Sequence, residues 1–226
     1  PGGHGALLRN LAALGGDDAL GGLELLLRDR NSGVRDAAQT SIVMLGGRDA
    51  IRRMVPLLTA KDAGLRNAAI DILRKIGMDG TDILHDIARD ANDNVRLFAL
   101  DILGSVGSQE SLGTLIEGLY DENPNVRNAA VISLGELGSE ESFKHLKKLI
   151  NDEEWIRFSV IETLARIPHE DVVPFLLDEL SRRSDDEITM CAILETLGKI
   201  GSPDSVRPLI AMLQNAGKYV EAAIAQ

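Results

Sequence analysis

The sequence predicts an all-α fold, a right-handed α-α superhelix made of about seven stacked helical hairpins. Three observations predict it. A Val-Arg, Leu-Arg or Ile-Arg pair recurs at 30- or 31-residue intervals, as expected of a solenoid of short repeats. Residues that start and end helices recur in the same phase. Hydrophobic residues make up 44% of the chain but aromatic residues only 3%, and such an aliphatic core suits closely packed helices better than a β-sandwich.

The recurring arginine sets the register of the repeats. These arginines are Arg35, Arg66, Arg96, Arg127 and Arg157, and the next equivalent positions are Thr189 and Glu221. Asp29, Asp90 and Asp121 stand six residues before three of them. We therefore expect a structural ladder of Arg–carboxylate pairs linking adjacent repeats. An anion-binding site is the alternative, but ligand-binding residues need not recur at every hairpin, whereas structural ones do.

Each repeat is expected to contain a first helix of about 11–13 residues, running from a cap to a glycine. The expected N-caps, four residues before the register position, are Asn31, Asp62, Asn92, Asn123, Glu153 and Asp185. The expected ends are Gly46, Gly77, Gly107, Gly138, Pro168 and Gly201. Small pairs such as Ala37-Ala38 and Ala68-Ala69 follow the register position and allow neighbouring helices to stack closely.

A second helix follows in each repeat. Ser108, Ser139 and Ser202 each precede a carboxylate by two residues, which predicts hydroxyl N-caps. Apolar residues then recur at helical spacing, as at Leu112 and Leu115. The predicted repeats of one continuous solenoid over residues 1–226 are approximately 1–28, 29–60, 61–89, 90–120, 121–151, 152–183, 184–214 and a partial 215–226.

The two terminal helices lack partners in this scheme. Residues 4–14 would form a first helix ending at Gly15-Gly16, and residues 218–226 a first helix with no second helix after it. An unpaired terminal repeat leaves apolar surface uncovered. We therefore expect the chain to be a piece of a longer protein.

The repeat pattern resembles a known family. Asn123, Val126-Arg127, Ala129-Ala130 and Ser139 represent a pattern of Asn/Asp-x-x-Val-Arg-x-Ala-Ala, Leu-Gly and Gly-Ser-x-Glu-Ser that is similar to the short HEAT-like repeats of phycobilisome bilin lyases. The resemblance covers essentially the whole chain. It implies a HEAT-like or armadillo-type solenoid whose second helices line the concave face. It also implies an interaction module, because few members of such families are enzymes.

Composition narrows the function classes. The net charge of −11 disfavours general nucleic-acid binding, since an acidic surface repels phosphates. The sequence has no apolar run long enough for membrane insertion and no visible signal peptide. A single cysteine, Cys191, makes no internal disulfide, so a cytoplasmic location is expected.

No set of residues predicts catalysis, a metal or a cofactor. HEAT-like di-iron hydroxylases, by resemblance, carry repeated His-Glu pairs, whereas this chain has only His169-Glu170. Cys191 occupies the small-residue position of its repeat, which predicts a packing thiol and not a nucleophile. The sequence therefore predicts a non-enzymatic protein with no catalytic residues, metal ligands or cofactor.

The second helices carry the candidate partner-binding surface, called the ridge below. It consists of residues one, two or five positions after the apolar anchor of each second helix, which we expect to point outward. They are Arg52, Arg53, Thr114, Glu117, Lys144, His145, Lys148, Phe175, Asp178 and Arg207. Five cations against two acids predict an acidic or polar protein segment as the ligand. An ordinary solvated surface explains the same residues equally well.

Trp155 and Phe158 form a secondary surface candidate. They stand three residues apart, on one face of the expected helix, where the previous repeat has Asn125 and Asn128. Large aromatic residues are frequent interface anchors. The alternative is local packing in an irregular repeat.

The sequence thus predicts a non-enzymatic protein-interaction scaffold that binds a protein partner on its concave face. A bilin lyase or related tetrapyrrole-protein chaperone subunit is the alternative from another class. An architectural spacer within a larger protein is the third. The sequence names neither the partner nor the oligomeric state.

Overall fold

The computed structural model describes residues 16–183 and 186–211, which contain helices and no strands. The contacts divide the chain into two units, residues 1–137 and residues 138–226, and each unit is described by itself. The predicted all-α fold of repeated helical hairpins is confirmed. The expected first helix at residues 4–14 and the partial repeat at 215–226 lie outside the described residues.

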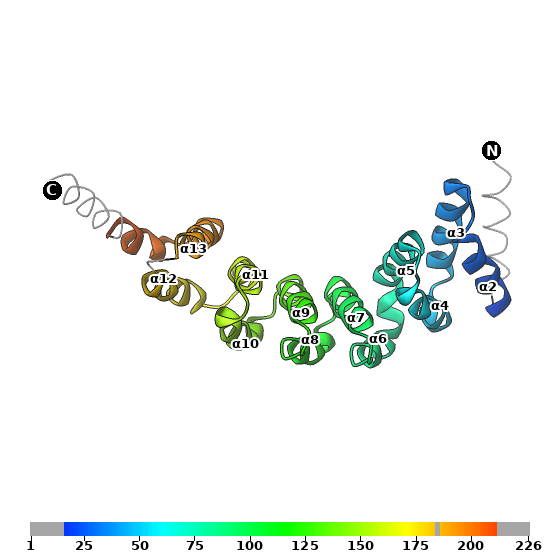
Figure 1. The fold of residues 1–226 in the computed structure, drawn as a ribbon, viewed down its shortest axis with the longest axis horizontal. Helices are drawn as coiled ribbons and strands as arrows, with labels where there is room; N and C mark the ends of the chain where they lie inside the picture. Colours follow the sequence, from blue (N-terminus) through cyan, green and yellow to red (C-terminus); the bar gives the residue numbers. More distant parts are fainter. Residues whose placement is uncertain (1–15, 184–185, 212–226) are drawn as a thin grey trace. The chain divides into compact units, whose positions relative to one another are not determined.

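Unit 1 contains two rows of helices (Figure 1). The first helices are α3 (Ser32–Leu45), α5 (Ala63–Ile76), α7 (Asp93–Val106) and α9 (Pro124–Leu137). The second helices are α2 (Asp17–Leu26), α4 (Gly47–Met54), α6 (Thr81–Ile87) and α8 (Leu112–Gly118). Short 3-10 helices extend the second helices: η1 (Val55–Thr59) follows α4, and η2 (Gly77–Gly80) and η3 (Gln109–Ser111) precede α6 and α8.

Unit 2 repeats the alternation of first and second helices. The first helices are α11 (Glu154–Leu164) and α13 (Glu187–Ile200). The second helices are α10 (Phe143–Leu146), which lies between η4 (Glu140–Ser142) and η5 (Lys147–Asn151), and α12 (Val172–Arg182). Residues 203–211 are also helical.

The predicted N-caps of the first helices are mostly confirmed. The side chains of Asn31, Asp62, Asn92 and Asn123 each accept a hydrogen bond from the backbone N–H two residues later. Glu153 is the N-cap residue of α11 as predicted, but its side chain makes no capping hydrogen bond. Asp185 lies outside the described residues, and its neighbour Asp186 caps α13 by accepting from the N–H of Thr189 at 3.0 Å.

The glycines that end the first helices serve two different purposes. Gly107, Gly138 and Gly201 have φ values of 72°, 63° and 66°, in the left-handed region that side chains disfavour. Gly77 also ends its helix, α5, but it does not adopt the left-handed conformation, because its φ is −61°. A Cβ there would lie 2.8 Å from Cγ2 of Val106, so Gly77 permits close packing.

The second helices begin differently from the prediction. Ser108 and Ser139 make no side-chain capping hydrogen bond. Their carbonyls instead accept from the N–H of Ser111 and of Ser142, both at 3.0 Å. The resulting 3-10 turn satisfies these donors within the backbone, so a hydroxyl cap is not needed. Ser202 does accept, from the N–H of Asp204 at 3.3 Å.

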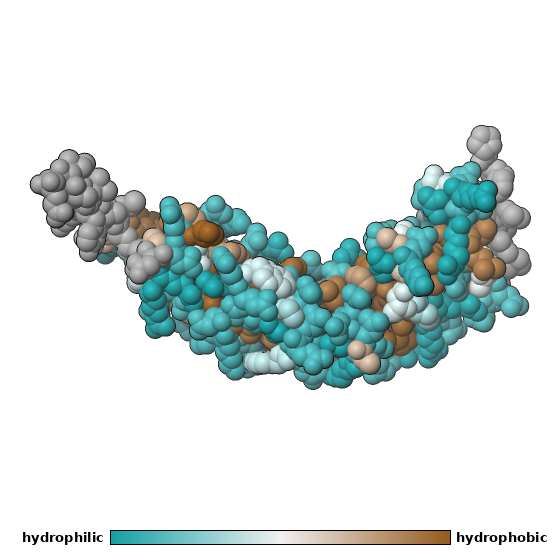
Figure 2. Space-filling view, in the orientation of Figure 1, coloured by the Kyte–Doolittle hydropathy of each residue, from teal (hydrophilic) through white to brown (hydrophobic). Residues whose placement is uncertain are grey.

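The core of each unit is aliphatic, and side chains between the two rows of helices are fully buried. Ala38, Ala69 and Ala130 have no exposed surface, which agrees with close stacking of the first helices. Cys191 is exposed, so its prediction as a packing thiol is wrong. In the pairs that end with Ala38, Ala69 and Ala130 the first residue is half-buried and only the second is fully covered, whereas in Cys191-Ala192 neither residue is fully covered. In the view of Figure 2, hydrophilic residues cover most of unit 1.

Candidate functional site

The register arginines hold the loop that precedes their own helix. Nη1 of Arg35, Arg66, Arg96 and Arg127 donates to the carbonyl oxygen six residues earlier, at 2.7–3.0 Å. Arg66 makes this bond to Ala60, so an aspartate at that position is not required. The predicted structural role is supported by these contacts, but the carbonyl, not the carboxylate, is the common acceptor.

Arg96 and Arg157 reach the following repeat. Arg96 forms a bidentate pair with Asp121, at 2.7 Å and 2.8 Å. Arg157 makes no bond to its preceding loop and instead donates to Oδ2 of Asp186 at 3.0 Å and to Oγ1 of Thr189 at 3.2 Å. Arg183 holds that preceding loop, because its Nη2 donates to the carbonyl of Ile150 at 3.1 Å.

Ion pairs connect the second helices of unit 1 in succession. Arg53 on α4 pairs with Asp17 and Glu24 on α2, with N–O distances of 2.7 Å and 3.3 Å. Arg48 on α4 pairs with Asp82 on α6 at 2.6 Å, and Arg89 follows α6 and donates Nε to Glu117 on α8 at 3.0 Å. The hydrogen bonds from Arg48 lower the pKa of Asp82 to about 2. Unit 1 therefore has a continuous ladder of ion pairs between repeats. It lies on the second helices, not on the first helices where we expected it.

The ridge residues of unit 1 lie in this ladder or beside it. Arg53 and Glu117 are members of it, and Arg52 is exposed and pairs with Asp49 at 3.0 Å. Thr114 is a correction: it is 8% exposed and does not point outward. Thr114 shares a helix face with Gly118, whose close packing against Leu100 covers that face.

In unit 2 the ridge is more exposed but chemically mixed. Lys144 pairs with Glu141 at 2.7 Å, and Asp178 pairs with Arg182 at 2.8 Å. Burial, followed by repulsion from its two lysine neighbours, lowers the pKa of His145. Lys148 and Arg207 are exposed.

Phe175 is half-buried and does not project from the ridge. Its ring lies edge-on to the ring of Phe143, with centroids 5.7 Å apart. His169 packs on the same ring at 4.5 Å. This aromatic cluster holds the start of α12 against α10.

Trp155 and Phe158 both lie on α11. Trp155 is 40% exposed, and its Nε1 donates to Glu153 at 2.8 Å. Phe158 is half-buried. The local contact to Glu153 fits the alternative of packing within the repeat, while the exposed part of the indole leaves an interface role as a proposal.

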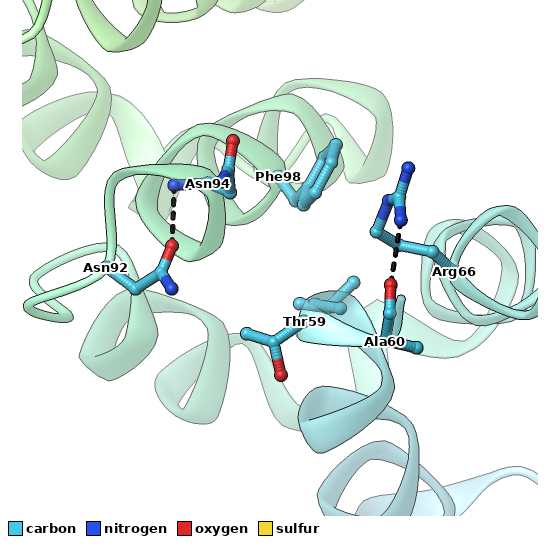
Figure 3. A pocket seen from close by; sticks show the side chains of 7 residues that line it. Thr59, Ala60, Arg66, Asn92, Asn94 and Phe98 are labelled. Atoms are coloured by element: carbon cyan, nitrogen blue, oxygen red, sulfur yellow. Dashed lines mark hydrogen bonds between the residues drawn. The ribbon is translucent and has the colours of Figure 1, made fainter. Parts of the chain in front are cut away.

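Sequence reasoning missed a cavity in unit 1 that lies between the loop after η1 and the start of α7 (Figure 3). Its volume is about 300 Å³. The lining residues are Leu58, Thr59, Ala60, Arg66, Asn92, Asn94 and Phe98. Phe98 was the one signal in the sequence, because it replaces the small residue that stands at Ala68 in the repeat before.

A second cavity, of about 430 Å³, lies within unit 2 between the loop after α11 and the end of α13. Its lining includes three basic side chains, Arg166, His169 and Lys199. Lys199 pairs with Glu162 at 3.3 Å. His169 accepts from the N–H of Asp171 through Nδ1 at 3.1 Å, so both of these side chains are already engaged.

In the described part of the chain, no helix is long and apolar enough to cross a membrane. Likewise, no three His, Cys, Asp or Glu side chains among residues 16–183 and 186–211 are placed to hold a metal ion together.

The alternation of first and second helices defines a helical-hairpin repeat protein. Comparison with known families then gives the particular class. The family model of HEAT repeats matches residues 81–159 and 151–226, and the chain belongs to the HEAT repeat family. Proteins of this kind typically act as scaffolds for protein interactions. No curated protein matches the sequence.

Two solved structures are similar to this chain. Kap95 in the Kap95:Nup1 complex is similar at 18% identity with a TM-score of 0.53, over 92% of this chain and 32% of that one. The complex of CpcE and CpcF of phycocyanin lyase from Nostoc sp. PCC7120 is similar at 22% identity with a TM-score of 0.49, over 65% of this chain and 98% of that one. At these identities the likeness concerns the fold alone.

Proposed function

We propose that this chain is a non-enzymatic scaffold that binds a segment of a partner protein. The membership of the HEAT repeat family carries this proposal. A stack of hairpins presents a long surface on which positions outside the repeat pattern are free to vary. The ridge is such a set of positions, and its cations fit an acidic or polar segment.

The ion pairs of the ridge are compatible with this role. Arg52 and Lys144 pair only with acids three residues earlier on the same element or the preceding turn, and both partners are exposed. Exposed pairs of this kind contribute about 0–1 kcal/mol. A carboxylate of a partner therefore competes for these cations at little cost. Arg53 differs, because its two acids connect α4 to α2.

The test compares two charge-reversal variants of equal charge change. Arg52→Glu/Lys144→Glu/Lys148→Glu alters the ridge, and Arg28→Glu/Arg30→Glu/Lys75→Glu alters exposed cations outside it. After circular dichroism has established equal helicity, each variant is used for affinity capture from native lysate. We expect the ridge variant to lose a protein that wild type and control retain. Equal capture by all three would refute the ridge as the binding surface.

A further inference from the structure

The arginines of two neighbouring repeats differ in what surrounds them. The closed junction, between the fourth and fifth repeats, contains Arg96, Asp93, Asp121 and Asn123. Here Arg96 is bound by Asp121 and also by Asp93, whose Oδ1 lies 3.0 Å from Nη2. The side-chain amide of Asn123 donates to the other oxygen of Asp93 at 2.6 Å. Nε and Nη2 of Arg96 and the side-chain amide of Asn123 therefore have carboxylate acceptors, while Nη1 of Arg96 donates to backbone carbonyls.

The open junction, between the third and fourth repeats, contains Arg66, Ala63, Asn92, Asn94 and Phe98. Alanine stands at position 63, where the closed junction has Asp93. Among the described residues, Arg66 donates one hydrogen bond, to the carbonyl of Ala60 at 2.7 Å.

The aspartate equivalent to Asp121 does not serve Arg66 either. Asp90 stands at that position, and its carboxylate accepts from the N–H of Asn92 at 2.7 Å. Asn92 uses its own side-chain oxygen to accept from the N–H of Asn94 at 2.9 Å, so its amide nitrogen is the donor that remains. The open junction thus has the donors of the closed junction without their carboxylates.

The missing acceptors coincide with the cavity. Arg66 lies on one side of it, and Asn92, Asn94 and Phe98 lie on the other (Figure 3). The volume of 300 Å³ is about ten times the ~30 Å³ that one water occupies in the liquid. Phe98, which is half-buried, adds apolar wall beside the donors. The cavity is therefore suited to a carboxylate on a short apolar stem.

We propose that the open junction binds a glutamate side chain of an extended partner segment. The carboxylate takes the place that Asp121 and Asp93 occupy in the closed junction, between Arg66 and the amide of Asn92. Arginine binds carboxylates in bidentate geometry, and the two methylenes of glutamate pack on Phe98. This inference rests on the proposed function only in that the ligand belongs to a partner protein.

The test uses the ¹⁵N-labelled full chain and three short peptides in NMR titrations. The probe is acetyl-Gly-Gly-Glu-Gly-Gly-amide. The second peptide has Gln in place of Glu, and the third has Ala with a free terminal carboxylate. We expect the Glu peptide to move the side-chain amide signals of Asn92 and Asn94 and the Nε–H signal of Arg66. The Gln peptide should bind at least about tenfold more weakly, because it lacks the charge.

Matched variants locate the binding. Arg66→Gln should weaken binding of the Glu peptide about tenfold or more. Arg35→Gln removes the same type of carbonyl bond at the preceding junction, where the following repeat has Ala68 instead of Phe98, and should leave binding unchanged. Asn94→Asp keeps the bond of Arg66 to Ala60 and should repel the peptide.

Three results would overturn the inference. They are equal binding of the Glu and Gln peptides, stronger binding of the peptide with the free terminus, and no binding of any peptide to wild type. The ridge variant should bind the Glu peptide as wild type does. Failure at the ridge with success here, or the reverse, therefore separates this inference from the proposed function.

Discussion

The closed and open junctions of unit 1 carry the same register arginine in the same bond to its own loop. They differ in what the next helix offers. At the closed junction, α9 follows α7 so closely that a Cβ on Gly104 would lie 2.5 Å from Cβ of Ser133. At the open junction, α5 and α7 are joined by the ion pair of Arg74 with Asp101 at 2.7 Å, and Phe98 stands where α9 has Ala129.

A repeat protein can thus gain a site without a new motif. Four of the five register arginines bond the loop before their own helix. At the open junction, Ala63 stands where the closed junction has an acid and Phe98 where it has a small residue, and the remaining donors of Arg66 face a cavity. A structural residue thereby becomes available for binding.

The largest expected effect is at the closed junction. Asp121→Asn should lower the free energy of unfolding by about 3 kcal/mol, because it leaves the largely buried Arg96 without its bidentate acceptor. Urea unfolding followed by circular dichroism measures the loss. Asp90→Asn is the matched control at the open junction and should cost less than about 1 kcal/mol, since it disturbs only a local turn. Equal losses would mean that the two junctions do not differ.

Gly104→Ala should destabilise by about 2 kcal/mol, because its new methyl group meets the backbone and side chain of Ser133. Gly198→Ala, in α13, is the control. Nothing lies within 4 Å of its added Cβ, so this variant should gain about 0.5–1 kcal/mol from helix propensity. Thermal unfolding of both variants measures the contrast. A neutral Gly104→Ala would indicate that α7 and α9 are not so closely packed.

The closed junction should also depend on pH. The hydrogen bonds from Arg96 lower the pKa of Asp121 in the folded chain. A carboxyl with a lowered folded pKa stabilises above its unfolded pKa, and this stability is lost as the pH falls through the folded pKa. The stability difference between wild type and Asp121→Asn should therefore shrink from about pH 6 to about pH 2. A difference that stays constant over this range would argue against the pair.

The smallest stability effect comes from closing the open junction. Ala63→Asp places an acid at the first residue of α5, which is the position that Asp93 occupies beside Arg96 in the next repeat. We expect a gain of about 0.5 kcal/mol from Arg66 and the helix dipole, with binding of the Glu peptide weakened about tenfold. Ser32→Asp makes the same change beside Arg35 and should leave binding unchanged. Undiminished binding by Ala63→Asp would place the peptide elsewhere.

The candidate site was less predictable than the fold. Arg53 and Glu117 were expected to face a partner, yet they contact Asp17, Glu24 and Arg89 of neighbouring hairpins. Their partners lie 28–36 residues away in the sequence, so spacing within one helix does not reveal them. Thr114 failed for a related reason, since the packing of Gly118 sets the orientation of α8.

The sequence by itself determined that this protein is a stack of helical hairpins, and it placed most first helices between a side-chain cap and a glycine. These features follow from local hydrogen bonds and backbone sterics, which depend on residues a few positions apart. Only the tertiary structure decided which arginines find carboxylates, where the ion-pair ladder runs and where a cavity opens. Those outcomes depend on the distance between helices of successive repeats. The size of single residues, such as Phe98 and Gly104, determines how closely these helices pack.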